Sequence, residues 1–292
     1  MTSKKGLCYT PCVIVDFHTH IFPPQVIQER EVYLSQDRTF ATMYSHPQAK
    51  MTTAEGLIAS MDKAGIERSV VLNIGWTAQN LCIETNDYIM KSVQRYPDRL
   101  VGFCSINPLD EGAADEVQRC AREGLKGVGE LHPDVQGYDL GDERVLTPVM
   151  EAAKRHGMII LTHASEPVGH LYPGKGKVSP AVLYRFISQF PEHTIVCAHW
   201  GGGLPFYALM PEVAKALKNV YFDSAASPFL YRPEVFLKVM ELVGVEKILF
   251  GTDYPLIQQK RLLDQIDGLA LSPNKRELIL SGNAQRVLGL DR

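Results

Sequence analysis

The sequence predicts a (β/α)8 barrel, in which parallel strands alternate with helices. Three observations support this fold class: short apolar runs recur at even spacing, segments of helical period lie between them, and metal-binding side chains follow several runs directly. Near-continuous apolar strands indicate burial on both faces, which is typical of a parallel sheet covered by helices. We expect one domain over residues 1–292, with loop insertions at about 22–53 and 166–177.

Eight runs rich in Val, Ile and Phe are the expected strands. In chain order they are 13–17, 69–74, 100–106, 125–131, 158–162, 194–198, 220–223 and 247–251. Between them, residues 54–64 and 146–156 repeat apolar side chains at helical spacing. The tail at 273–290 has the same period and is expected to close the barrel. The alternative is an open doubly wound sheet, which would need a glycine-rich phosphate loop where this chain has Asp16-Phe17-His18-Thr19-His20.

The charge and composition of the chain limit the classes of partner that we expect. The formal net charge is -3 without a run of basic residues, so neither nucleic acid nor a membrane surface is expected as a partner. A small-molecule substrate remains. No apolar stretch approaches the roughly 20 residues of a membrane span, and six scattered cysteines suggest reduced thiols, so a cytoplasmic location is expected.

Metal-binding side chains cluster at the ends of the expected strands. They are His18 and His20 after the first, Glu130 in the fourth, His163 after the fifth, His199 after the sixth and Asp253 after the eighth. The carboxyl ends of parallel barrel strands meet at one mouth, so these residues should surround one site. Imidazole and carboxylate groups are ligands of zinc, iron and manganese.

Each of these residues alone has an ordinary explanation. Asp253 fits a helix N-cap, His199 a hydrogen-bonded core histidine, and Glu130 a solvated carboxylate. Their joint placement favours a metal site, because buried charges are costly unless they are paired or bind a metal. His18 and His20 are two apart on an extended segment, so both rings should project to the same side.

Four motifs resemble the amidohydrolase superfamily, in its amidohydrolase 2 branch with the aminocarboxymuconate-semialdehyde decarboxylase-like enzymes. The motifs are Val15-Asp16-Phe17-His18-Thr19-His20, Leu161-Thr162-His163-Ala164, Cys197-Ala198-His199-Trp200-Gly201-Gly202 and Phe250-Gly251-Thr252-Asp253-Tyr254-Pro255. The resemblance implies that His18, His20 and His163 bind a divalent metal, commonly Zn²⁺, with Mn²⁺ or Fe²⁺ as alternatives. It implies that Asp253 is both ligand and proton acceptor, and it also implies a homodimer.

The number of metal ions depends on two further positions. In relatives with one metal, the histidine that matches His199 is catalytic or polarises the substrate, whereas in two-metal relatives it is a ligand. Glu130 resembles the glutamate that binds metal in two-metal nucleases, so it decides between one ion and two. A nuclease function is not favoured, because the charge is near neutral.

The resemblance leaves two reactions open. The main hypothesis is hydrolysis of a lactone, an amide or a related carbonyl compound, with metal-activated water, Asp253 as proton acceptor and either His199 or a metal polarising the carbonyl. The alternative is a non-oxidative decarboxylase of an aromatic or muconate-like acid. A metal-free binding or scaffold barrel is a third hypothesis, and the intact ligand set argues against it.

Substrate contacts are expected from residues beside the motifs. Phe22, Trp200 and Tyr254, together with Tyr172, could form an aromatic pocket. A decarboxylase also needs a cation for the substrate carboxylate, and Arg232 is the main candidate, followed by Lys175 and Lys177.

Overall fold

Parallel strands form the centre of the molecule, a computed structural model that describes residues 13–290. Within that range eight strands lie in chain order, each paired in parallel with the next. They are β1 (Val15–His20), β2 (Arg68–Leu72), β3 (Leu100–Cys104), β4 (Gly127–Leu131), β5 (Ile159–Thr162), β6 (Ile195–Cys197), β7 (Val220–Asp223) and β8 (Ile248–Leu249). The Phe17 and His20 amides donate to the Phe250 and Tyr254 carbonyls at 2.7 Å, which joins the last strand to the first. The expected (β/α)8 barrel is confirmed.

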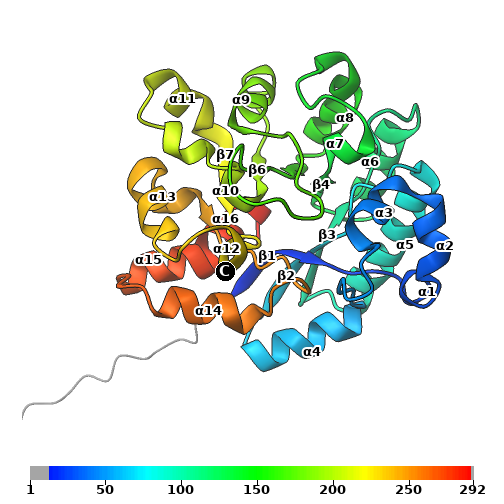
Figure 1. Cartoon of the computed structure of the whole chain (residues 1–292), viewed down its shortest axis with the longest axis horizontal. Coiled ribbons are helices and arrows are strands. Elements are labelled where there is room, and N and C mark those ends of the chain that lie inside the picture. The colour runs from blue at the N-terminus through cyan, green and yellow to red at the C-terminus, as the bar shows by residue number, and fades with distance from the viewer. Residues whose placement is uncertain (1–12, 291–292) are drawn as a thin grey trace, which may run out of the picture.

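Helices surround these strands (Figure 1). The longer ones are α4 (Ala54–Ala64), α5 (Gln79–Arg95), α6 (Ala113–Arg122), α8 (Glu143–Arg155), α9 (Pro180–Gln189), α13 (Val235–Val243) and α14 (Gln259–Asp267). The shorter ones are α7 (Pro133–Gln136), α10 (Ala198–Gly201), α11 (Pro211–Ala216), α12 (Ser227–Leu230), α15 (Pro273–Glu277), α16 (Asn283–Leu288), η1 (Leu204–Tyr207), η2 (Leu217–Asn219), η3 (Val245–Lys247) and η4 (Leu278–Gly282). α4 has the predicted bounds, because the Thr53 side chain accepts from the Gly56 amide and Gly65 ends the helix at φ 71°.

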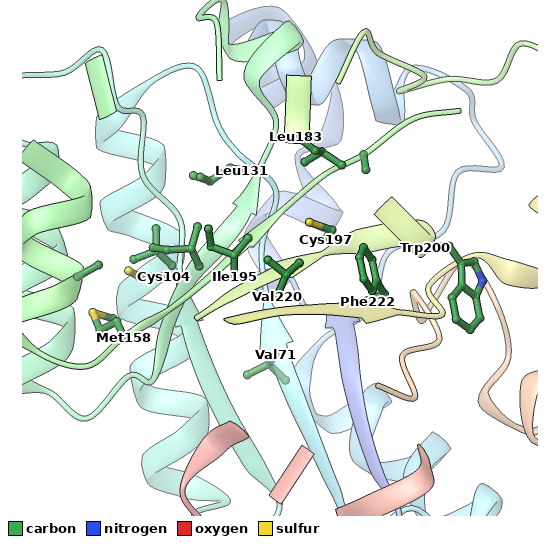
Figure 2. Packing of buried hydrophobic residues seen from close by; sticks show 14 of the residues in the cluster. Val71, Cys104, Leu131, Met158, Leu183, Ile195, Cys197, Trp200, Val220 and Phe222 are labelled. Atoms are coloured by element: carbon green, nitrogen blue, oxygen red, sulfur yellow. The ribbon is translucent and has the colours of Figure 1, made fainter. Parts of the chain in front are cut away.

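Two apolar layers hold the barrel together. The outer layer lies between strands and helices, where Ile195, Val220 and Phe222 pack together (Figure 2). The inner cluster fills the barrel, with Phe17 and Phe103 edge to face at 5.9 Å. Ala284 and Leu288 of α16 belong to the inner cluster, so the tail closes the barrel, as predicted, and it does so at the amino-terminal end.

Two strands carry an extra residue at the point where functional side chains begin. The pairing register shifts between Asp16 and Thr19 in β1, and between Val128 and Leu131 in β4. Such a bulge changes which side chains face the barrel axis. In β1 it allows Phe17 to join the inner core while the next residue, His18, faces the mouth.

The first insertion is more ordered than the sequence suggested. Residues 22–53 contain α1 (Pro24–Gln28), α2 (Arg30–Gln36) and α3 (Arg38–Tyr44). Their aromatic side chains form a separate cluster in which Phe40 stacks on Trp76 at 5.1 Å and Phe22 packs against Tyr44 at 5.1 Å. The second insertion, 166–177, has no helix or strand in the described structure.

The described cysteines agree with reduced thiols. Cys82, Cys104, Cys120 and Cys197 are free and buried, while Cys8 and Cys12 lie outside the described residues. Among residues 13–290, none of the helices combines the length and apolar character needed to cross a membrane.

Candidate metal centre

The six predicted ligands come together at the carboxyl end of the barrel. Their atoms fall into two groups, each with ligand atoms within 4.8 Å of one another: His18, His20 and Asp253, and Glu130, His163 and His199. All of these side chains are buried or nearly so. The structure therefore brings together residues that are up to 235 positions apart in the sequence.

The first group contains a close pair of histidine nitrogens. His18 Nε2 and His20 Nε2 are 3.0 Å apart, and Asp253 Oδ1 lies 3.2 Å from His20 Nε2. Both rings face the same side, as the spacing predicted. The second group is centred on Glu130, whose Oε1 lies 3.0 Å from His163 Nδ1 and 3.4 Å from His199 Nε2.

Glu130 connects the two groups. While its Oε1 faces His163 and His199, its Oε2 lies 3.6 Å from His18 Nε2 and 3.7 Å from His20 Nε2. Each carboxylate oxygen thus faces one group. Gly129 permits this approach, since its φ is 149° and a Cβ there would lie 2.4 Å from the Leu161 carbonyl oxygen.

The orientation of His18 fits a metal ligand. Its Nδ1 lies 2.8 Å from Asp223 Oδ2, and a carboxylate that holds one ring nitrogen leaves the other free to bind a metal. Asp223 is itself fixed, because its Oδ1 accepts from the His199 and Ala225 amides at 3.0 Å. A cation between the His18 and His20 nitrogens would also explain why two ring nitrogens face each other in a buried site.

The backbone near the site is strained at several positions. Four residues have φ between 53° and 64°, a left-handed backbone conformation that residues other than glycine rarely adopt: His199, Trp200, Ala226 and Asp253. All four follow β6, β7 or β8. Strain of this kind gathers at functional sites, where the surrounding structure maintains it.

The charges in the site are strongly coupled. Burial raises the pKa of Glu130, but hydrogen bonds and charges of the surrounding histidines outweigh burial and bring it well below its ordinary value. Burial also raises the pKa of Asp253, whereas His20, His18 and His199 lower it to about 2. Burial lowers the pKa of His199, but Glu130 more than offsets this and raises it to about 9. These pKa shifts favour ionised carboxylates at Glu130 and Asp253 and a protonated ring at His199.

A cavity of about 520 Å³ opens above these groups. Its floor contains His20, Glu130, His163, His199 and Asp253. Its walls are largely apolar and come from both insertions and from the segments after β7 and β8: Met43, Tyr44, Ala49, Tyr172, Pro173, Ala226, Phe229, Leu230, Pro255 and Leu256. Both insertions therefore supply part of the walls above the candidate metal ligands.

Most of the expected substrate contacts lie elsewhere. Phe22 is buried in the aromatic cluster of the first insertion, and Tyr254 in the outer apolar layer. Trp200 packs edge to face on Phe236 at 4.8 Å. Arg232 is exposed, and none of these four lines the cavity. That these four residues bind the substrate stays a prediction, and their positions outside the cavity lining do not favour it.

The expected lysines also lie outside the cavity lining. Lys175 Nζ donates to the Val168 and His170 carbonyls within its own loop, and Lys177 is exposed. Tyr172, in contrast, does line the cavity.

Sequence reasoning missed three residues of the site. They are His132, which lines the cavity, Asp223, which holds His18, and Lys50, which lies at the cavity rim. His132 follows Glu130 at the spacing that separates His18 and His20, so the sequence did contain a signal for it. Asp223 ends the seventh expected strand, so the same strand-end criterion could have found it, whereas Lys50 has no such signal.

Comparisons with known proteins agree with this geometry. The sequence model of the amidohydrolase family matches residues 15–290. The chain is 27% identical over 248 residues to 2-amino-3-carboxymuconate-6-semialdehyde decarboxylase from Dictyostelium discoideum, covering 73% of this chain and 68% of that protein. It is 22% identical over 286 residues to gamma-resorcylate decarboxylase from a Polaromonas species, covering 80% and 86%.

Solved structures share the fold. The 5-carboxyvanillate decarboxylase of Sphingomonas paucimobilis superposes with a TM-score of 0.79 at 16% identity, covering 96% of this chain and all of that one. A dihydroxybenzoic acid decarboxylase from Polaromonas, with bound manganese and the inhibitor 2-nitroresorcinol, gives a TM-score of 0.72 at 18% identity, covering 96% and 98%.

Proposed function

Because this chain belongs to the amidohydrolase family, we propose that it is a metal-dependent decarboxylase of an aromatic or muconate-like carboxylic acid. One observation carries the proposal: an apolar-walled cavity large enough for a planar acid stands on a floor of histidines and carboxylates. The named relatives support this reaction, since they are decarboxylases of such acids. The hydrolase hypothesis has no comparable support, so the decarboxylase alternative replaces it.

The residues present fit a divalent cation. His18, His20 and Asp253 would hold the first ion, and Glu130, His163 and His199 would form a second position if two ions bind. Mn²⁺ is the first ion to test, because decarboxylases of this fold have been solved with manganese. When bound, the cation would supply positive charge that holds substrate oxygens and stabilises negative charge developing on the substrate.

The protein side chains would handle one proton. Decarboxylation replaces the carboxylate on one carbon by a hydrogen, so a proton must reach that carbon as the bond to carbon dioxide breaks. His199 lines the cavity, and despite its burial the negative charges of Glu130 and Asp253 raise its pKa to about 9, which favours its protonated form. Its Nδ1 lies 3.1 Å from the Ala225 carbonyl, which fixes the ring with Nε2 towards the cavity floor. With one ion held by His18, His20 and Asp253, His199 is not a ligand, and we assign proton delivery to it.

The test is carbon dioxide release from a panel of acids. Protein loaded with Mn²⁺ would be incubated with hydroxybenzoates, carboxyvanillate and muconate-like acids, alongside lactones and amides. The proposal predicts carbon dioxide from at least one acid and, in heavy water, one deuterium at the carbon that lost the carboxylate. Lactone or amide cleavage without carbon dioxide release would restore the hydrolase hypothesis.

A further inference from the structure

His132 is a buried cavity residue that the mechanism above does not use. It follows β4 directly, is 1% exposed and lines the cavity beside Glu130. Its ring stacks on that of His163, with ring centroids 4.9 Å apart and planes at 22°. It therefore faces the same space as the candidate metal ligands.

The contacts of the His132 ring decide where its proton lies. Nδ1 is 3.3 Å from the Gly75 amide nitrogen and 3.3 Å from the Glu130 carbonyl oxygen. The Gly75 amide can only donate, so a proton on Nδ1 would face another N–H group. Buried N–H groups without an acceptor are rarer than carbonyls with spare capacity. Nδ1 therefore accepts from Gly75, and the ring proton is on Nε2.

The Nε2–H group lacks a partner within the described chain. It lies 3.3 Å from Glu130 Oε2, but the two groups are not aligned for a hydrogen bond, and none of the other atoms of residues 13–290 accepts from it. A buried donor without an acceptor requires an explanation, and a bound ligand provides one.

The backbone around His132 holds the ring in place. The His132 amide donates to Gln136 Oε1 at 3.0 Å, and Gln136 Nε2 donates to the Trp76 and Ile106 carbonyls at 2.9 and 2.8 Å. Gly75 leaves room for this network, because a Cβ there would lie 2.5 Å from Gln136 Oε1. The ring is thus fixed by the segments that follow β2 and β3.

The other lining side chains with donor groups lie mostly in the two insertions, whereas His132 lies beside Glu130; those in the insertions are Tyr44, His46, Gln48, Lys50, His170 and Tyr172. Among the described lining residues, Lys50 is the one lysine or arginine, and it is exposed at the rim with Nζ 3.3 Å from the Leu256 carbonyl. We propose that His132 binds the substrate directly, with Nε2–H donating to an oxygen of the carboxylic acid. This inference rests on the proposed decarboxylase function and assigns to it a residue that determines which acids bind.

The test compares two substitutions that keep different halves of the ring. His132→Gln places an N–H group near the position of Nε2, whereas His132→Asn keeps a polar atom near Gly75 but does not reach the cavity. Binding of 2-nitroresorcinol, which carries nitro oxygens and has no carboxylate to lose, would be measured by calorimetry in protein loaded with Mn²⁺. Affinity for Mn²⁺ alone would be measured separately. His156→Asn, on the exposed end of α8, is the matched control.

We expect His132→Asn to bind 2-nitroresorcinol about tenfold more weakly, and His132→Gln to remain within about threefold of the wild type. Affinity for Mn²⁺ should change by less than about threefold in both. Unchanged binding of 2-nitroresorcinol by the Asn variant would overturn the inference. An equal loss of Mn²⁺ affinity would also overturn it, because His132 would then support metal binding through Glu130 instead of binding the substrate. If the Asn variant does not fold, a tenfold loss in the Gln variant contradicts the inference. No binding by the wild type would count against the decarboxylase proposal itself, and the inference would fall with it.

Discussion

The two ends of the barrel are built from the same strands but differ in chemistry and in backbone geometry. Towards the amino-terminal end the inner cluster is apolar, with Phe17 against Phe103, and α16 covers it. At the carboxyl end the inward side chains are histidines and carboxylates. The four left-handed residues other than glycine in the described chain all lie at this second end.

This difference separates stability from function. The apolar end buries side chains that stabilise the fold, whereas the mouth holds ionised groups close together in a strained backbone. Barrel enzymes generally place catalytic residues at the carboxyl ends of strands and stabilising contacts at the opposite end. Substitutions at the carboxyl end should therefore change activity, and substitutions at the amino-terminal end should change the free energy of unfolding.

Asp253→Asn should have the largest effect. Asparagine tolerates the left-handed backbone at this position, so the fold should survive, but the charge beside His18 and His20 is lost. We expect activity to fall about 10³- to 10⁴-fold, with the free energy of unfolding unchanged or slightly raised. The rate of carbon dioxide release would measure activity, and urea unfolding would measure the free energy of unfolding. A loss of activity below tenfold would contradict this assignment.

Phe103→Ala should have the opposite pattern. Phe103 is fully buried in the inner cluster and packs against Phe17 and Gly127. Removing the ring should lower the free energy of unfolding by about 3–5 kcal/mol, with kcat per folded molecule within about threefold. Leu109→Ala, at a half-exposed position, is the control and should change stability by less than about 0.5 kcal/mol. Equal losses of stability in Phe103→Ala and Leu109→Ala would contradict the stabilising role of the apolar end.

Asp223→Asn should have a smaller effect, confined to the mouth. The amide oxygen can still accept from the His199 and Ala225 amides, which leaves the amide NH₂ facing His18 Nδ1. That contact moves the His18 proton to Nε2, where it blocks metal binding. We expect Mn²⁺ affinity to fall about 10- to 100-fold, measured by competition with a chelator. An affinity within twofold of the wild type would show that Asp223 does not orient His18.

The sequence was sufficient for the barrel and for the six candidate ligands, because both depend on spacing. Apolar runs mark the strands, and parallel strands bring their carboxyl ends together. It was insufficient where one residue of register matters: the shifts in β1 and β4 that bring His18 and Glu130 to the mouth depend on pairing between strands. Aromatic residues beside motifs were also ambiguous, since Phe22 and Trp200 pack in apolar clusters whereas Tyr172 lines the cavity.

The metal content of the protein tests the central claim most directly. Protein loaded with Mn²⁺ and then desalted should retain at least one ion per chain. If Glu130 links two ions, the wild type should retain two and Glu130→Ala one. Removal of the metal by a chelator should abolish carbon dioxide release, and added Mn²⁺ should restore it. Protein that retains no metal, and whose activity is the same with and without chelator, would contradict the assignment of this mouth as a metal centre.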